Sequence, residues 1–264
     1  MEKSAAHYLQ IYDAQLRTDA ETQGSEKVQR LGPLYLATFA QGQGFITYPH
    51  ITGTEPVPLC DLVAPALAHF AAQPQISSVE FKTRGHDNTP GLEQELHTHG
   101  FIAQDAEAVM IGPLQELAAV QKIPAGVTLR SITTRADIQA MCRMSDQAFG
   151  ERFDSHAAEE LCDRLEHTDG MEIWVAEDDH QMVGAGRLEP VAGSDFAGMW
   201  GGSVLPEYRG RGIYRALTAA RARSALARGL RYAHSDSTKY SQPILERSGM
   251  LAVTTTTPYL WTRP

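Results

Sequence analysis

The sequence VLPEYRGRGIY, at residues 204–214, decides the fold of the second half of this 264-residue chain. A strand-like run precedes it, and a helical pattern rich in small residues follows it. A strand, a basic glycine loop and a helix in this order form an anion site, because free N–H groups point outward at the positive end of the helix dipole. Gly210 and Gly212 allow close approach of the backbone to an anion. Arg209 and Arg211 add positive charge, so the pattern predicts a bound pyrophosphate.

Two common phosphate-binding loops do not fit this stretch. The P-loop requires Gly-x-x-x-x-Gly-Lys-Ser/Thr, and no Lys-Ser/Thr pair follows these glycines. The dinucleotide-binding motif requires a third glycine where this chain has Arg215, and it belongs in a first strand-helix unit rather than deep in the chain.

The motif Val204-x-Pro206-x-x-Arg209-Gly210-x-Gly212-Ile213, followed by ILERSGM at residues 244–250, resembles the GCN5-related N-acetyltransferase (GNAT) superfamily. Residues 127–264 as a whole resemble the family in their order of strands and helices. The resemblance implies that backbone groups near the end of the strand pair with the pantetheine arm and thioester of acetyl-CoA, while loop amides hold the pyrophosphate. The strands Phe196–Leu205 and Leu230–Ser235 are then expected to part around the thioester. The implied coenzyme A contacts are Val204, Leu205, Arg209, Gly210, Arg211, Gly212, Ile213 and Tyr214.

The first half of the chain resembles a degenerate GNAT unit. The run LHTHGF at residues 96–101, followed by EAVMI at 107–111, parallels the helix, glycine and strand of 245–254. No Arg-Gly-x-Gly loop precedes it, so this half is not expected to bind coenzyme A. We infer that it supports or closes over the acceptor site of the second half.

The expected fold is therefore α/β, with two GNAT-like domains that each contain a central twisted mixed β-sheet flanked by helices. Pro124 and Gly126 do not suit the interior of an element and mark the linker. We place a degenerate GNAT-like domain at residues 1–120 and an acetyl-CoA-binding catalytic domain at 121–264.

Apolar residues at helical spacing predict the helices, and β-branched or aromatic runs bounded by turn residues predict the strands. In the first half we expect a hairpin at Leu34–Thr47, a helix at Leu59–Ala72, a strand at Val79–Thr83 and a short helix capped by Thr89 and Pro90. In the second half we expect strands at 127–132, 171–176, 182–188, 196–205 and 230–235, helices after Thr134 and at 156–165, 213–228 and 242–248, and a terminal strand pair at Leu251–Trp261.

Acyl transfer to an amine requires that the amine be neutral when it attacks and that the leaving thiolate be protonated or stabilised. The resemblance places Gly198 where many family members carry a base glutamate, and Leu245 where the acid tyrosine usually stands. Neither residue can transfer a proton. Tyr214 also departs from the family, which has Gly or Ala there, so its side chain is expected to point away from the phosphates, toward the pantetheine or the core.

Other polar residues near the motif are the candidates for these roles. Glu189 and Asp236 are candidate bases, although Glu189 also suits a solvated strand end and Asp236 a turn cap. Tyr240 is a candidate acid or a packing residue, and Ser241 either bonds the coenzyme or caps a helix. His234 is interpreted as a buried structural histidine.

Two further histidine patterns bear on binding. His86 and Asp87 suit either an acceptor pocket or a turn that caps the helix after Pro90. No His/Cys cluster has metal-ligand spacing, and we expect no metal.

Composition excludes several classes of protein. The net charge of −9 argues against a nucleic-acid partner, which requires a basic face. No apolar stretch approaches the ~18 residues of a membrane span. The three cysteines lack Cys-x-x-Cys spacing and no signal sequence is evident, which favours reduced thiols and a cytoplasmic location.

The leading hypothesis is an acyltransferase of the GNAT type that transfers an acetyl group from acetyl-CoA to a primary amine of a small molecule. The alternative is a non-catalytic acyl-CoA-binding regulatory or scaffold protein, which the missing standard acid and base favour. A third hypothesis, aminoacyl transfer by a tandem GNAT-like protein that binds transfer RNA, is disfavoured by the acidic composition and by the intact coenzyme loop.

Overall fold

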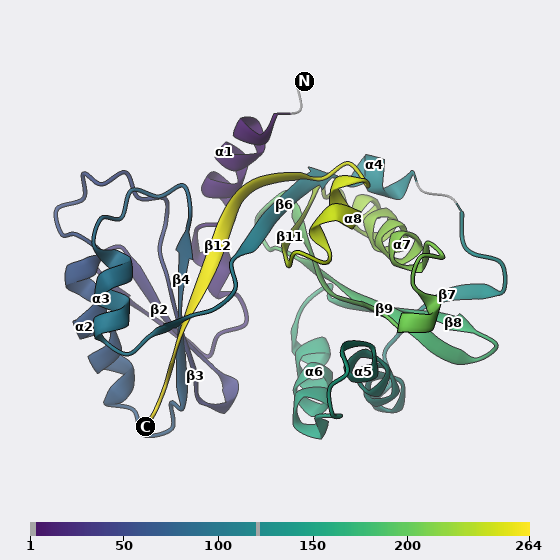
Figure 1. Cartoon of the computed structure of the whole chain (residues 1–264), viewed down its shortest axis with the longest axis horizontal. Coiled ribbons are helices and arrows are strands. Elements are labelled where there is room, and N and C mark those ends of the chain that lie inside the picture. Colours follow the sequence, from purple (N-terminus) through teal and green to yellow (C-terminus); the bar gives the residue numbers. More distant parts are fainter. Residues whose placement is uncertain (1–3, 120–121) are drawn as a thin grey trace. The chain divides into compact units, whose positions relative to one another are not determined.

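The computed structural model describes residues 4–119 and 122–264. The chain forms two compact units (Figure 1). Unit 1 comprises the described part of Met1–Val109 together with Asp236–Gln242 and Ala252–Pro264, and unit 2 comprises the described part of Met110–Ser235 together with Pro243–Leu251. The predicted boundary at residues 120 and 121 lies outside the described residues. The units also contain different segments from the predicted domains, because Asp236–Gln242 and Ala252–Pro264 belong to unit 1.

Unit 1 is built on a mixed sheet with the strand order β1-β2-β3-β4-β12. The first three strands are antiparallel, β3 and β4 are parallel, and β12 runs antiparallel to β4. A parallel pair requires a crossover connection, which α2 supplies between β3 and β4. The strands are β1 (Lys27–Leu31), β2 (Leu34–Phe39), β3 (Gln43–Thr47), β4 (Ser78–Arg84), the short β5 (Ile102–Ala103) beside β12, and β12 (Leu251–Thr262).

The helices of unit 1 are α1 (Ala5–Gln15), α2 (Cys60–Ala71) and α3 (Leu92–Thr98), with 3₁₀ turns η1 (Asp19–Thr22) and η2 (Ala40–Gly42). Helices α2 and α3 lie together beside this sheet (Figure 1). Phe70 of α2 packs over Gly44 of β3, where a Cβ would lie only 2.9 Å from the Phe70 ring. The unit therefore has its own hydrophobic core.

The strand order in unit 2 is β6-β11-β10-β9-β8-β7, where the first three residues of β6 and the last two of β11 belong to unit 1. Helices α5 and α6 lie on one face of this sheet and α7 lies on the other (Figure 1). The strands are β6 (Glu107–Pro113), β7 (Val127–Ile132), β8 (Glu172–Asp178), β9 (Gln181–Pro190), β10 (Phe196–Val204) and β11 (Tyr232–Ser237). The helices are α4 (Leu114–Ala118), α5 (Arg135–Phe149), α6 (Ser155–His167), α7 (Ile213–Ala227) and α8 (Gln242–Glu246), with the 3₁₀ turn η3 (Pro206–Tyr208).

The predicted elements are largely confirmed, with several differences. The terminal strand pair at Leu251–Trp261 is wrong, because β12 is one continuous strand that pairs with β4 from Thr256 to Thr262. The cap at Thr89 and Pro90 is also wrong, since Gly91, with φ 79°, immediately precedes α3. Strand β1 was not predicted, because its residues are mostly polar and exposed. No helix among the described residues is both long and apolar enough to cross a membrane.

Charged side chains are partly or fully buried on β4 in unit 1. The Arg84 guanidinium pairs with the carboxylate of Glu21, and the Lys82 ammonium lies 2.5 Å from Asp236. Burial opposes the charge on Lys82, but Asp236 and Glu21 outweigh it and raise the pKa of this lysine. Burial raises the pKa of the nearby Glu80 above its usual value, against the opposing effect of Lys82. Glu80 therefore favours its protonated form more strongly in the folded protein than in the unfolded chain.

We expect Glu80→Gln to stabilise the protein at alkaline pH. A folded-state pKa above the unfolded value means that the stability contributed by this group is present at low pH and is lost as pH rises through the folded pKa. The free energy of unfolding of Glu80→Gln should exceed that of the wild type at pH 8, and the difference should shrink toward pH 4.5. Urea denaturation across this range measures it, and a difference that does not change with pH contradicts the assignment.

Candidate functional site

The glycine loop joins β10 to α7 in unit 2 and leaves its backbone open. Gly210 and Gly212 have φ values of 75° and 92°, and a Cβ added at either position would meet no atom within 4 Å. Gly212 immediately precedes the first helical residue, Ile213, and no side chain caps the helix there within the part of the chain that the structure describes. The N–H groups of the first turn of α7 are therefore available to an anion.

The two loop arginines have different surroundings. Arg209 donates from Nη2 to the carbonyl of Ala148 at 2.6 Å and from Nε to the carbonyl of Val204 at 3.1 Å. These bonds tie the loop to the end of α5, so Arg209 acts mainly as an anchor. Arg211 is exposed, with its guanidinium carbon 4.6 Å from the ring centroid of Tyr208. Arg211 is the loop arginine better placed to meet a phosphate.

Strands β10 and β11 part, as predicted. They pair in parallel at three positions in the described chain, from Phe196 opposite Tyr232 to Gly198 opposite His234. Beyond Gly198, β10 continues along β9 as far as Val204. An edge of β10 therefore opens beside β11, next to the glycine loop.

A β-bulge bends β10 at this opening. Trp200 pairs with Arg187 and Ser203 with Ala185, so Gly201 and Gly202 together face Gly186 alone. The ring of Tyr214 packs over Gly202, where a Cβ would lie 2.6 Å from Tyr214 Cε2. Tyr214 thus points toward the strand, which explains why a large side chain is accepted at a position where the family has Gly or Ala.

The backbone N–H, the carbonyl and the side chain of Leu205 all have partners within unit 2. Its N–H donates to the carbonyl of Val183 at 3.0 Å, and its carbonyl accepts from the N–H of Tyr208 at 2.9 Å. The side chains of Leu205 and Ile213 belong to the hydrophobic core. These two residues position the loop, whereas the resemblance had implied direct contacts between the Leu205 backbone and the coenzyme.

Arg221 lies beneath the bulge and was missed by the sequence analysis. It is 2% exposed and donates to the carbonyls of Arg187 at 2.9 Å and Trp200 at 3.4 Å. A Cβ on Gly186 would lie 2.6 Å from its guanidinium carbon. Burial lowers the pKa of Arg221 to about 10, so it still carries its charge at neutral pH. Arg221 therefore joins α7, which begins at the glycine loop, to the bulge in β10.

Gly186→Ala tests this packing. The added methyl group has no room beside a buried guanidinium, and we expect a loss of about 1–3 kcal/mol in the free energy of unfolding. When Arg221 is replaced by Met, Gly186→Ala should cost less free energy of unfolding, because the flexible methionine side chain can move away from the added methyl group. Denaturant unfolding of the four proteins measures the coupling, and an equal cost in both backgrounds contradicts the contact.

Of the two candidate bases, Glu189 lies in unit 2. It pairs with Gly198 across β9 and β10, so its side chain leaves the sheet beside the glycine that replaces the usual glutamate. Its carboxylate accepts from Arg164 Nη2 at 2.9 Å and from Arg187 Nε at 3.1 Å, and the side chain is 17% exposed. Two arginines thus fix the orientation of this carboxylate.

The other three catalytic candidates belong to unit 1. Asp236 is paired with Lys82, which accounts for its carboxylate without a role in catalysis. Tyr240 is 78% exposed, so the packing role considered for it is excluded. Ser241 Oγ donates to the carbonyl of Thr238 at 3.4 Å. Leu245, in unit 2, is buried in place of the usual acid tyrosine.

Trp200 occupies the space above Gly198. A Cβ at Gly198 would collide with Trp200 Nε1, and the indole meets the ring of His234 edge-on with centroids 5.1 Å apart. The sequence carried a signal for this contact, because residues two apart on a strand share a face.

The parted strands and the glycine loop at a helix start define an α/β fold of the N-acetyltransferase class. Residues 138–250 match the model of the Acetyltransferase (GNAT) family. The matched segment contains the predicted motif at residues 204–213. Comparison with curated protein sequences gave no match.

Solved structures extend the likeness to most of the chain. A GCN5-related N-acetyltransferase from Kribbella flavida is similar with a TM-score of 0.69 and 18% identity, covering 91% of this chain and 92% of that one. A conserved protein of unknown function from Staphylococcus epidermidis has a TM-score of 0.69 and 16% identity, covering 94% and 98%. A tandem GNAT protein from the clavulanic acid biosynthesis pathway has a TM-score of 0.60 and 15% identity, covering 88% and 79%. The predicted tandem GNAT fold is thereby confirmed.

Proposed function

We propose that this chain is an N-acetyltransferase that transfers an acetyl group from acetyl-CoA to a primary amine, with a small molecule as acceptor. The observation that carries the proposal is the parting of β10 and β11 beside an open glycine loop. A parted edge offers unpaired backbone groups to an extended ligand arm, and the adjacent loop offers amides to its phosphates.

The residues present suit coenzyme A. Open space at Gly210 and Gly212 admits a pyrophosphate to the backbone, and Arg211 is exposed beside them. The amides of residues 209–214 would hold the pyrophosphate, and the bulged edge of β10 would align the pantetheine arm. Bound acetyl-CoA supplies an acyl group activated as a thioester.

We assign proton removal from the attacking amine to Glu189. Its carboxylate projects beside Gly198, where the paired part of β10 and β11 ends. Arg164 and Arg187 hold it in one orientation, which a general base requires. Tyr240 and Ser241 stay sequence-based candidates for the acid, and Asp236 stays the second candidate base.

Gly212→Glu should strongly weaken binding of coenzyme A. The new side chain would be strained at positive φ and would bring a carboxylate to the anion site, so we expect at least about a 100-fold weaker Kd, or ~2.7 kcal/mol. Gly193→Glu is the matched control, because Gly193 also has positive φ (72°) and open space around it but lies in a turn before β10. Calorimetric titration measures both, and tight binding by Gly212→Glu refutes the site.

Glu189→Gln should lower kcat with little change in the Kd for acetyl-CoA. Loss of a general base costs typically about 10²–10⁴-fold in rate. Glu177→Gln removes another arginine-paired carboxylate from the same sheet and should retain wild-type rates. Thiol release from acetyl-CoA with a panel of primary amines gives the rates, and a wild-type kcat in Glu189→Gln would exclude it as the base.

The alternative function is a non-catalytic acyl-CoA-binding regulatory or scaffold protein. The buried Leu245 favours it, because a leucine at the usual position of the acid supplies no proton. Coenzyme A binding without thiol release for any amine of the panel would establish this alternative over the enzyme.

A further inference from the structure

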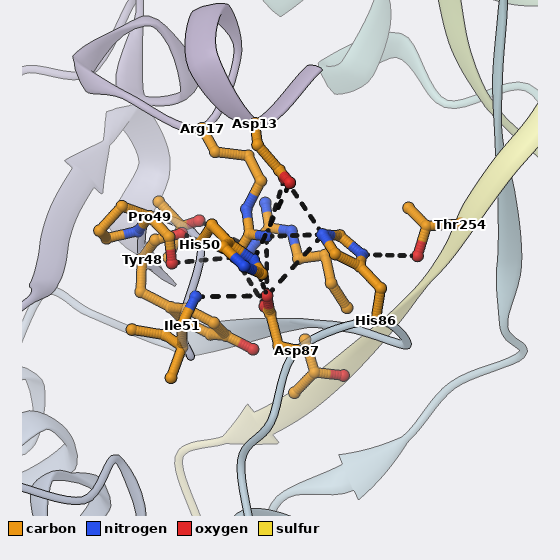
Figure 2. Close-up of polar contacts among 12 residues, drawn as sticks. Asp13, Arg17, Tyr48, Pro49, His50, Ile51, His86, Asp87 and Thr254 are labelled. Atoms are coloured by element: carbon orange, nitrogen blue, oxygen red, sulfur yellow. Dashed lines mark hydrogen bonds and ion pairs between the residues drawn. The ribbon is translucent and has the colours of Figure 1, made fainter. Parts of the chain in front are cut away.

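Unit 1 contains a cluster of metal-binding side chains that no sequence motif announces. Asp13 of α1, His50 after β3 and His86 after β4 each offer a donor atom, and these atoms lie within 4.8 Å of one another (Figure 2). The three residues lie far apart in the sequence, so the spacing rules that predicted no metal had no means of detecting them.

Both ring nitrogens of His86 have polar partners. His86 Nε2 lies 3.1 Å from Arg17 Nη1, which only donates, and 3.1 Å from Asp13 Oδ1, which only accepts. The other ring nitrogen, Nδ1, lies 2.7 Å from Thr254 Oγ1, which can accept its proton when Nε2 binds an ion. Histidines that bind metals usually have the second nitrogen held in this way.

Asp87 balances the charge of Arg17. The two side chains are completely buried and meet through two bonds, Nη1 to Oδ1 at 2.9 Å and Nη2 to Oδ2 at 2.6 Å (Figure 2). Arg17 Nη2 also donates to the carbonyl of Pro49 at 2.9 Å. Arg17 Nη1 also lies 3.1 Å from Asp13 Oδ1, so one guanidinium stands against two carboxylates and one negative charge remains to offset a bound cation.

His50 opens the cluster to solvent. Its side chain is 42% exposed, and its Nδ1 lies 2.9 Å from Asp87 Oδ1 and 3.9 Å from Asp13 Oδ2. Asp13 in turn lies 3.1 Å from His86 Nε2, so its carboxylate reaches toward both imidazoles. An ion can thus enter from the His50 side.

We propose that Asp13, His50 and His86 bind one divalent transition-metal ion of the zinc class, with water completing the coordination. Two imidazole nitrogens and one carboxylate suit Zn²⁺ or Co²⁺ and disfavour Mg²⁺ and Ca²⁺, which prefer oxygen ligands. The ion binds Nε2 of His86 in the tautomer that carries its proton on Nδ1, while Arg17 keeps its bonds to Asp87 and Pro49. It joins α1 to the loops after β3 and β4, and it therefore stabilises unit 1.

Titration of the chelator-treated full chain, without a polyhistidine tag, with ZnCl₂ tests the proposal. We expect one ion per chain and a rise in the midpoint of thermal unfolding, since an ion that binds the folded state stabilises it. Co²⁺ should give visible absorption bands typical of low-symmetry coordination. Absence of stoichiometric binding to the wild type overturns the site.

His50→Ala is the decisive variant, because His50 is exposed and its loss should leave the fold intact. The Kd for Zn²⁺ should weaken at least about tenfold, and His50→Ala combined with His86→Ala should bind no stoichiometric ion. His99→Gln is the matched control, since His99 pairs with Glu95 at 3.0 Å outside the cluster. Wild-type affinity in His50→Ala, or an equal loss in His99→Gln, contradicts the assignment, and circular dichroism verifies that each variant is folded.

Discussion

The separation of β10 from β11 after Gly198 is the constraint on which the site in unit 2 depends. Continuous pairing would use the backbone groups of β10 that an extended ligand needs. The bulge at Gly201 and Gly202 bends the strand at this point, and Arg221 supports it by donating to carbonyls on β9 and β10. Because Arg221 belongs to α7, the helix that begins at the glycine loop also holds the bulge, so one element positions both parts of the proposed coenzyme site.

Local features of the sequence predicted the glycine loop. The side chains around it are set by contacts between residues far apart in the sequence. The positive φ values at Gly210 and Gly212 follow from the glycines themselves, and the element order follows from apolar periodicity. The position of Arg221 under Gly186 and the pairing of Asp236 with Lys82 depend on folding across many residues. Periodicity along the chain carries no information about such pairs. For the same reason the sequence predicts a strand pair where β12 is one strand, since its partner β4 lies far away in the sequence.

In the proposed enzyme, the residue assigned to proton removal differs from the one usual in the family. Gly198 and Leu245 stand where the family usually has its base and acid, and the structure explains both: Trp200 fills the space above Gly198, and Leu245 is buried. Glu189 projects from the neighbouring strand directly opposite Gly198. In this proposal the base carboxylate therefore lies on β9 instead of β10, where two arginines orient it.

The central claim is that coenzyme A binds along the parted edge of β10 and at the start of α7. Hydrogen–deuterium exchange of the full chain with and without coenzyme A tests it most directly. The account predicts that coenzyme A slows exchange in peptides that cover residues 198–204 and 209–214, with little change in β7 and β8. Saturating coenzyme A that leaves both of these segments unprotected would contradict it.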